Sequence, residues 1–369
     1  MLAELERHAH ARAVLAPVIS GQAKPSHAYL FHGPGGAGKR SAARELAAEL
    51  LAAGSPEPEG AKARARAGSH PDLTWVVPSG AHEILVSDID QPVVAAASKT
   101  PFEGARRVFV IERVDELGDE AANRMLKTLE EPSGFVHLLL LTDRLTEVLP
   151  TISSRCQLVR FDAPPLEQVA GQLGELGVAP QTATALARIS LGAPDQARAL
   201  ASPEGAVLRG AAEDFARAAL AGRQWDRRPW QDILAAARGR GEAVRGELEE
   251  RARAEVELYP RRERKRVETE WTERIRRARR RAETGALDVA LQVVALWYAD
   301  LAALSWGAGE LVRHNDRLDE LRADLGPKPE RLMEAVELVE ETRRRFVLNV
   351  SEELALEALA SRLERALGR

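Results

Sequence analysis

The first part of the chain alternates short apolar runs with amphipathic stretches. Four of the runs predict strands: residues 27–31, 107–111, 136–141 and 158–161. Residues 107–111 predict a buried strand, and residues 136–141, apolar apart from His137, predict a strand covered on both faces of a parallel sheet. Residues 72–77 and 83–86 could form two further short strands. Residues 39–53 and 119–131 repeat apolar positions at helical spacing. Strands separated by helices predict a doubly wound α/β sheet, with residues 55–69, rich in Gly, Pro and charge, as a surface loop.

The pattern changes after the Ala-Pro-Pro sequence at residues 163–165. Residues 166–200 have the pattern of short helices without a strand, and the rest of the chain also looks helical. The sequence therefore predicts an α/β domain over residues 1–162, a small helical domain over 163–202 and an all-helical domain over 203–369. A length of 369 residues agrees with two or three domains.

Composition narrows the possible classes of function. Hydrophobic residues make up 45% and charged residues 29%, as in ordinary globular proteins, and a net charge of -4 argues against a general binder of polyanions. Cys156 is the single cysteine, so an internal disulfide and a multi-cysteine zinc site are excluded, and we expect it to be a small buried residue. No apolar run looks long enough to cross a bilayer, and the polar N-terminus is unlike a signal peptide. We therefore expect a cytoplasmic protein with no membrane partner.

A glycine-rich loop follows the first predicted strand and opens a predicted helix. Gly33, Gly35, Gly36 and Gly38 precede Lys39 in the spacing of a phosphate-binding loop. The glycines allow backbone N–H groups to surround phosphate oxygens, the lysine adds charge, and the helix N-terminus adds a partial positive charge. These residues are candidates for binding a nucleotide; the alternative is a glycine turn that only caps the helix.

The residues around this loop lack the chemistry of ATP hydrolysis. Arg40 stands where a Ser or Thr hydroxyl would ligate Mg²⁺, and Ser41 follows about 100° further around the helix. Glu112 could replace the usual metal-binding carboxylate, but the next residue is Arg113, whose guanidinium cannot act as a base. We expect no turnover and no bound metal at this site. Arg40, Ser41 and Glu112 stay candidates for contacts with a nucleotide that is bound without hydrolysis.

Three further segments carry a resemblance to a known family. They are Ser-His-Pro-Asp at residues 69–72, Leu-Lys-Thr-Leu-Glu-Glu-Pro at residues 126–132 and Thr-Ile-Ser-Ser-Arg-Cys at residues 151–156. In this order, behind a phosphate-binding loop, they resemble the AAA+ clamp-loader subunits of bacterial DNA polymerase III. The resemblance implies that the three predicted domains are an AAA+ P-loop domain, a helical lid and a helical collar.

The resemblance also implies roles for single residues. Arg155 would act in trans, as an arginine finger at the ATP site of a neighbouring subunit, unless it is only a surface arginine. Thr142 would be a polar sensor of the nucleotide, or else a hydroxyl that ends its strand. Asp195 stands where active members carry a sensor arginine. Together with Arg40 and Arg113, it favours the ATPase-poor delta-prime members over the active gamma/tau members.

The family further implies partners: the gamma/tau and delta subunits, the sliding clamp and, through the complex, primed DNA. No cofactor is required, although ATP or ADP could bind without hydrolysis, and no zinc is expected because residues 52–69 contain no cysteine. Two other functions stay open. One is a self-sufficient AAA+ ATPase, like gamma/tau or a helicase motor, and the other is a scaffold with neither a nucleotide nor an arginine-finger role.

A basic segment lies in the third predicted domain. Residues 261–284 contain eleven Arg or Lys against five Asp or Glu, and with the mixed helical stretch before them they predict a charged helical hairpin over about residues 240–284. The hairpin could bind DNA or an acidic partner, or it could be a solvated pair of helices with ion pairs such as Glu273 with Arg277. The apolar residues 287–304 predict a core helix.

Overall fold

In the computed structural model, which describes residues 5–78, 83–258, 260–346 and 351–368, the chain divides into two units, Met1–Pro164 and Pro165–Arg369. The division falls in the proline-rich break where the sequence places its first domain boundary. Residues on both sides of the second predicted boundary, between 202 and 203, share one hydrophobic core. The separation of a helical lid from a collar therefore stays a prediction.

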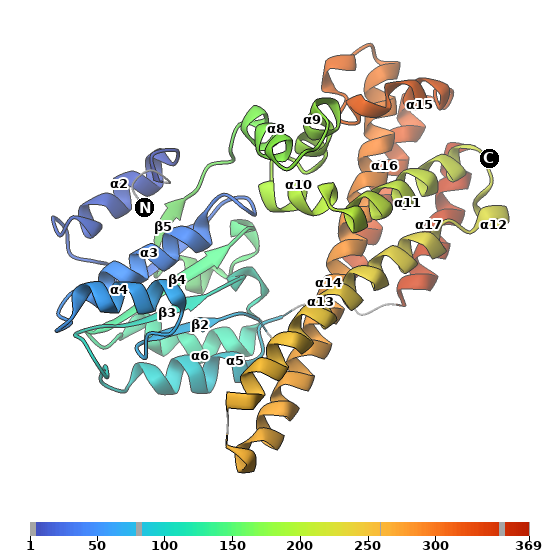
Figure 1. Ribbon diagram of the computed structural model, residues 1–369. Helices are drawn as coiled ribbons and strands as arrows, with labels where there is room; N and C mark the ends of the chain where they lie inside the picture. Colours follow the sequence, from blue (N-terminus) through green and yellow to red (C-terminus); the bar gives the residue numbers. More distant parts are fainter. Residues whose placement is uncertain (1–4, 79–82, 259, 347–350, 369) are drawn as a thin grey trace. The chain divides into compact units, whose positions relative to one another are not determined.

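A five-stranded parallel sheet forms the centre of the first unit (Figure 1). Its strands are β1 Ala28–His32, β2 Leu73–Val76, β3 Arg107–Ile111, β4 Val136–Thr142 and β5 Gln157–Arg160. The strand order is β2-β3-β4-β1-β5, so the strand before the glycine loop lies between β4 and β5. Every residue of β3 and β4 is buried, as predicted for strands covered on both faces.

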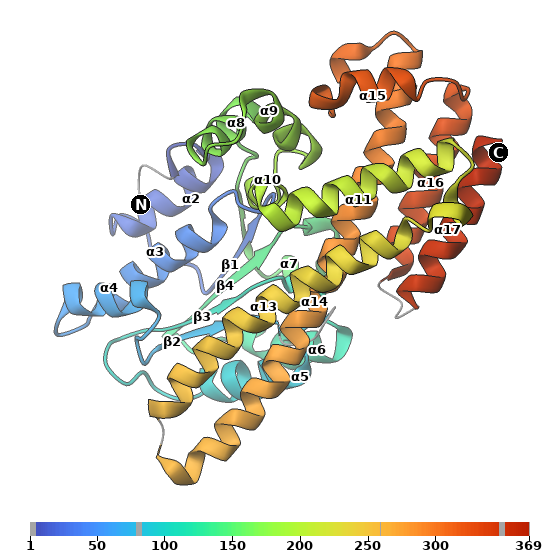
Figure 2. The ribbon, with the colours of Figure 1, turned by 45° about the vertical axis from the view of Figure 1, so that its right-hand side comes forward.

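Helices cover both faces of this sheet (Figure 1 and Figure 2). They are α2 Ala9–Ile19, α3 Lys39–Ala52, α4 Pro58–Ala67, α5 Val86–Ile89, α6 Asp119–Glu130 and α7 Pro150–Ser153, with a π-helical turn at Asp90–Ala95. Tyr29 and Phe31 of β1 point into the core under α2, α3 and α4, whereas Ala28 and Leu30 point into the core under α5 and α6. The doubly wound α/β sheet is confirmed.

Residues 55–69, predicted as a surface loop, contain helix α4. Pro58 occupies the first turn, where its missing N–H would have no partner in the helix. Ala61 and Ala65 lie one turn apart and are buried, and Gly68 ends the helix with a φ of 75°. The loop prediction is wrong because two alanines give a weak hydrophobic period among so many Gly, Pro and charged residues.

Residues 83–86 do not form the predicted strand. Ile84 makes a single bridge to Leu117, and helix α5 begins at Val86. The apolar character of this run comes from burial, because Ile84 is 2% exposed in the core under α5 and α6. Periodicity cannot distinguish a buried turn from a strand of this length.

The second unit contains helices and, among its described residues, no strand, as predicted. Its helices are α8 Leu166–Glu175, α9 Pro180–Ile189, α10 Pro194–Ala201, α11 Pro203–Leu220, α12 Gln224–Arg227, α13 Trp230–Leu258, α14 Arg261–Ser305, α15 Leu318–Ala323, α16 Pro329–Arg345 and α17 Glu352–Leu367. One hydrophobic core joins all of these helices except α12, and it includes the fully buried Trp230, Trp297 and Tyr298. The core helix predicted at residues 287–304 is confirmed as part of α14.

One helix of this unit meets the length and composition of a membrane span. An 18-residue window within residues 264–305 of α14 is apolar enough, contrary to the expectation from the sequence, but 72% of the window is buried inside the protein. Such burial is the pattern of a core helix, which passes the same test of length and composition.

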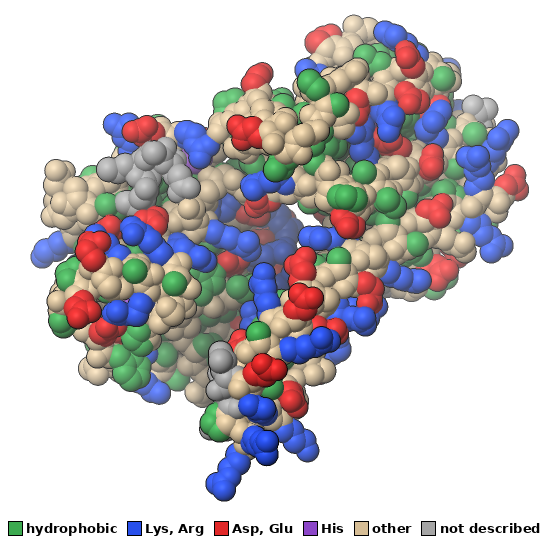
Figure 3. Space-filling model, in the orientation of Figure 1, with side chains coloured by type: hydrophobic (Ala, Val, Ile, Leu, Met, Phe, Trp, Pro, Cys, Tyr) green, Lys and Arg blue, Asp and Glu red, His purple; other side chains and the backbone are tan. Residues whose placement is uncertain are grey.

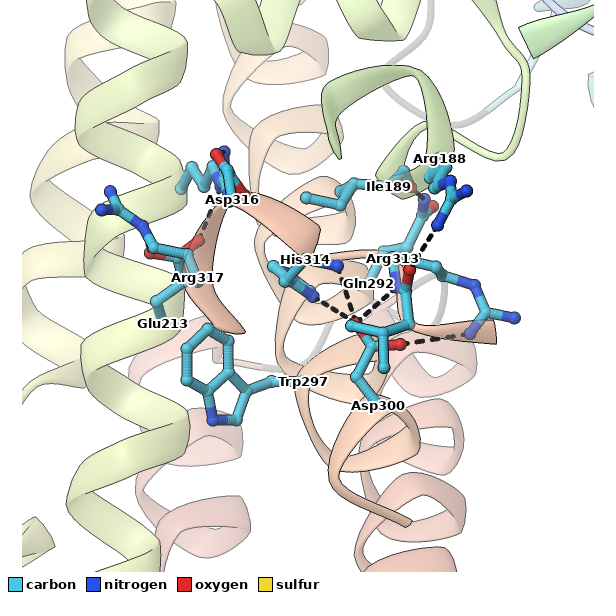
Figure 4. Close-up of polar contacts among 12 residues, drawn as sticks. Arg188, Ile189, Glu213, Gln292, Trp297, Asp300, Arg313, His314, Asp316 and Arg317 are labelled. Atoms are coloured by element: carbon cyan, nitrogen blue, oxygen red, sulfur yellow. Dashed lines mark hydrogen bonds and ion pairs between the residues drawn. The ribbon is translucent and has the colours of Figure 1, made fainter. Parts of the chain in front are cut away.

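A buried carboxylate fixes the segment that follows α14 (Figure 4). Asp300 is fully buried and accepts hydrogen bonds from the backbone N–H groups of Arg313 (2.9 Å) and His314 (2.8 Å). It also contacts Nδ1 of the His314 ring at 2.8 Å and the Arg313 guanidinium at 3.3 Å. Because these N–H groups would otherwise lack a partner, Asp300 is expected to contribute strongly to the stability of this unit.

Helices α13 and α14 form the predicted hairpin and lie side by side in both ribbon views (Figure 1 and Figure 2). Between them, Ala252, Val267 and Trp271 form a small hydrophobic cluster that is separate from the main core of the unit. This cluster holds the two helices together along the charged part of the hairpin.

Candidate functional site

The glycine loop lies between β1 and α3, at the carboxyl edge of the sheet. Gly33 and Gly38 have φ angles of 142° and 97°, which L side chains rarely adopt. A Cβ atom at Gly33 would lie 2.1 Å from the carbonyl oxygen of Phe161, so the close approach of the loop to this residue requires glycine. Gly35 and Gly36 complete the turn into the helix.

Lys39 is folded onto its own loop. Its ammonium donates hydrogen bonds to the carbonyl oxygens of Gly33 (2.6 Å) and Pro34 (2.7 Å) and pairs with Asp143 at 2.7 Å. An ammonium has three N–H donors, so all of them are in use, and a phosphate group would have to displace Asp143 to reach the lysine. Sequence reasoning missed Asp143, although its position directly after β4, the neighbour of β1, is a usable signal.

Arg40 and Glu112 bind each other. Nε of Arg40 donates to Oε2 of Glu112 at 2.9 Å and Nη2 donates to the same oxygen, while Nε1 of Trp75 donates to Oε1 at 2.7 Å. Glu112 is 5% exposed, and both of its oxygens are engaged. A Mg²⁺ ion, which binds through oxygen ligands, would compete with the Arg40 guanidinium for the Glu112 carboxylate. Ser41, the next residue of α3, is exposed.

Other residues near the loop have contacts of their own. Arg113, in a left-handed conformation with a φ of 56°, pairs with Glu116. The hydroxyl of Thr142 donates to Asp115 at 2.7 Å and accepts from the backbone N–H of Arg144 at 2.9 Å. These contacts are those of a hydroxyl that ends its strand, and the sensor role of Thr142 stays a prediction.

Arg155 lies just after α7 and is held from two sides. Nη1 donates to the carbonyl oxygen of Thr151 (2.9 Å) and to the hydroxyl of Ser154 (3.4 Å), and Nη2 pairs with Glu130 at the end of α6. The side chain is 35% exposed. Nε–H and the second hydrogen of Nη2 find no acceptor among the described residues. Glu130 belongs to residues 126–132, so two of the three family segments meet at this arginine.

The remaining family segment, residues 69–72, has a structural role. Asp72 is fully buried and accepts hydrogen bonds from the backbone N–H groups of Phe102 (2.7 Å) and Glu103 (3.0 Å). Nδ1 of His70 accepts from the N–H of Asp72 at 3.1 Å, and burial lowers the pKa of His70, which favours the neutral ring that can accept. The segment thereby fixes the loop that precedes β3.

The described part of the chain contains no group of three or more His, Cys, Asp or Glu side chains that could hold a metal ion. Burial raises the pKa of the Cys156 thiol to about 12, which disfavours the thiolate form that reacts. Asp195 and Arg198, at the predicted sensor position, belong to the second unit and pair with each other at 2.9 Å.

The parallel sheet, the glycine loop after β1 and the helices on both faces define the first unit as an α/β P-loop domain. Residues 13–165 match the family described as DNA polymerase III, delta subunit. The DNA polymerase III subunit delta' of Pseudomonas aeruginosa is 38% identical over 144 residues, which cover 37% of this chain and 44% of that protein. The delta' subunit of Bacillus subtilis is 37% identical over 169 residues, which cover 45% and 51%.

The DNA polymerase III subunit tau of Bacillus subtilis is 33% identical over 163 residues, which cover 42% of this chain and 28% of that protein. The chain spans about half the length of the two delta' relatives, 44% and 51%. Over residues 13–165, the chain is similar to the delta-prime subunits of DNA polymerase III, as the three segments predicted.

Proposed function

We propose that this chain is a non-catalytic AAA+ subunit of the bacterial replicative clamp loader. In this role it stands beside gamma/tau and delta subunits in the cytoplasm, helps to place the sliding clamp on primed DNA, and supplies Arg155 to the ATP site of a neighbouring subunit. The observation that carries the proposal is the contact of Arg40 with Glu112 inside a delta-prime type domain. This contact leaves the chain's own loop without a free carboxylate for Mg²⁺.

Arg155 supports the second half of the proposal. A trans arginine stabilises the negative charge that spreads over a phosphoryl group during its transfer. Such an arginine must be exposed, fixed in direction and able to offer N–H groups. Arg155 meets these needs, because its contacts with Thr151 and Glu130 fix the guanidinium while two N–H groups stay unused by the described residues.

A self-sufficient AAA+ ATPase is not favoured. Such an enzyme needs a hydroxyl next to the loop lysine, a free carboxylate at the end of the third strand and an acidic residue that activates water. Here these positions hold Arg40, a Glu112 that Arg40 already binds, and Arg113, which pairs with Glu116. A scaffold differs from the proposal in two respects: its glycine loop would bind no nucleotide, and Arg155 would be dispensable.

Reconstitution tests the proposed function. The clamp loader is assembled from the gamma/tau and delta subunits of the same organism, with and without this chain, and loading of the clamp on primed circular DNA is measured. We expect loading only when the chain is present, since a loader without it lacks the arginine of one ATP site. Equal loading in its absence would contradict the proposal.

We also propose that ATP or ADP binds the glycine loop without Mg²⁺. The Arg40 guanidinium supplies the positive charge, and the Glu112 carboxylate already accepts hydrogen bonds from Arg40 and Trp75. The dissociation constant of the purified chain for ATP, measured by calorimetry, is expected to change by less than about twofold between Mg²⁺ and EDTA buffers. Arg40→Ser frees Glu112 and is expected to make binding depend on Mg²⁺, whereas Lys39→Ala removes binding. No binding by the wild type, or a loss of about tenfold or more in EDTA, contradicts this proposal.

A further inference from the structure

The basic hairpin carries cations that the proposed function does not use. Residues 261–284 hold eleven Arg or Lys against five Asp or Glu, in a chain whose net charge is -4. Lys and Arg side chains gather at the free end of the hairpin, at the lower edge of Figure 3. The surplus of positive charge is therefore a local property of this segment.

The two sides of α14 differ along this segment. Val267 and Trp271 are buried between the helices, with exposed fractions of 4% and 7%. The opposite side presents exposed residues at intervals of four, three and four positions, which are Lys265, Thr269, Thr272 and Arg276. A partner approaching from solvent therefore meets a polar row that contains the cations Lys265 and Arg276, with the exposed Glu268 beside it.

Ion pairs within the hairpin occupy the basic residues that lie further from its free end. Arg276 and Arg277 pair with Glu273 at 2.7 and 3.7 Å, and Arg279 pairs with Glu242 of α13 at 3.1 Å. The predicted pair of Glu273 with Arg277 is thus confirmed. For this part of the segment, the interpretation as a solvated pair of helices is sufficient.

At the free end, three cations lack such partners. Arg261, Arg262 and Lys265 are exposed and make no ion pair with any acidic side chain in the described part of the chain. We call these three residues the arm tip. Lys265 lies one helical turn from Arg261, so their charges fall on the same side of the helix and stay available to a polyanion.

The surroundings of the arm tip favour a phosphate backbone as the partner. An interface with an acidic protein would need exposed apolar anchors among the cations, and single-stranded nucleic acid would need exposed aromatic rings for stacking. Trp271, the single aromatic ring described between residues 240 and 284, is 7% exposed, and the guanidinium of Arg274 lies over it, 4.5 Å from the ring centroid. Binding to the phosphates of a duplex needs neither anchors nor rings, because cations are sufficient.

We propose that the arm tip binds the phosphate backbone of duplex DNA without regard to base sequence. The three cations neutralise phosphates and release counterions, so the affinity falls as the salt concentration rises. This contact belongs to the isolated chain, and it would exist whether or not Arg155 serves a neighbouring ATP site.

The test uses the full chain and a short fluorescent DNA duplex, with anisotropy measured at several salt concentrations. The logarithm of the wild-type association constant is expected to fall with the logarithm of salt concentration with a slope of about -3, from three phosphate contacts. The triple variant Arg261→Glu, Arg262→Glu, Lys265→Glu is expected to bind about tenfold or more weakly at low salt, with a slope near zero. Its thermal unfolding is compared with that of the wild type, to show that the variant is folded.

A matched control changes the same net charge elsewhere on the second unit. Arg322, Lys328 and Arg365 are exposed, and their replacement by Glu is expected to leave duplex binding unchanged. An equal loss in both variants would mean that net charge alone acts, and it would overturn the proposal. So would the absence of salt-dependent binding by the wild type. Competition by polyglutamate as strong as that by unlabelled duplex, at equal charge concentration, would point to an acidic protein and would also overturn it.

Discussion

Replacement of Arg155 by alanine is expected to slow ATP hydrolysis by roughly a thousandfold at the neighbouring site that this arginine serves in the reconstituted clamp loader. The guanidinium acts on charge that develops during phosphoryl transfer, so the rate of hydrolysis falls while the affinity for ATP changes little. Single-turnover hydrolysis measures this effect, because one kinetic phase disappears while the phases of the other sites persist.

Two further variants separate the role of this guanidinium from a general effect of charge. Arg160→Ala removes an arginine of β5 that is 59% exposed and pairs with Asp162 at 3.0 Å, and it is expected to leave all phases unchanged. Arg155→Lys keeps the charge but loses the planar set of N–H donors, so its rate should lie between those of the wild type and Arg155→Ala. If Arg155→Ala matches Arg160→Ala in every phase, the arginine-finger role is wrong.

Replacement of Asp300 by alanine is expected to lower the free energy of unfolding of the second unit by about 3–5 kcal/mol. Asp300 is fully buried, and its carboxylate accepts from two backbone N–H groups and contacts the His314 ring. The variant leaves these N–H groups buried without an acceptor and opens a cavity beside α14, so the two costs add. Chemical denaturation followed by circular dichroism gives the loss.

The same helix offers a control for this prediction. Asp288 of α14 is 54% exposed and pairs with Arg343 at 3.0 Å, so Asp288→Ala should cost less than about 1 kcal/mol. Similar losses for the two variants would show that the buried carboxylate contributes no more than a surface ion pair.

The fold of the first unit was largely predictable because its central strands, β1, β3 and β4, are almost entirely buried. Residues 107–111 and 136–141 are apolar except for Arg107 and His137, and both form central strands of the sheet. In two other segments the hydrophobic pattern does not predict the structure. Helix α4 buries Ala61 and Ala65, which give too little hydrophobic contrast, and Ile84 is buried in a turn that periodicity cannot separate from a strand.

The residues that lack the chemistry of ATP hydrolysis could be identified from single positions in the sequence. The contacts that these residues make could not be predicted. Arg40 and Glu112 are 72 residues apart, and each was predicted to contact a nucleotide, whereas the structure shows that they bind each other. The sequence did not indicate that Trp75 contacts Glu112, since a tryptophan in a short strand is usually a core residue. Glu130 belongs to a family segment, but the sequence indicated no role for it. The structure shows that the end of α6 lies at Arg155, where Glu130 pairs with the guanidinium.

Two loaders compared in one single-turnover experiment decide whether this chain acts through Arg155 or through its own loop. One contains Lys39→Ala, which removes the ammonium from the glycine loop, and the other contains Arg155→Ala. We predict that the Lys39→Ala loader hydrolyses ATP within about twofold of the wild-type rate in every phase, while the Arg155→Ala loader loses one phase. Loss of a phase with Lys39→Ala and full activity with Arg155→Ala would show that the chain hydrolyses ATP itself, and would contradict a non-catalytic subunit that serves its neighbour.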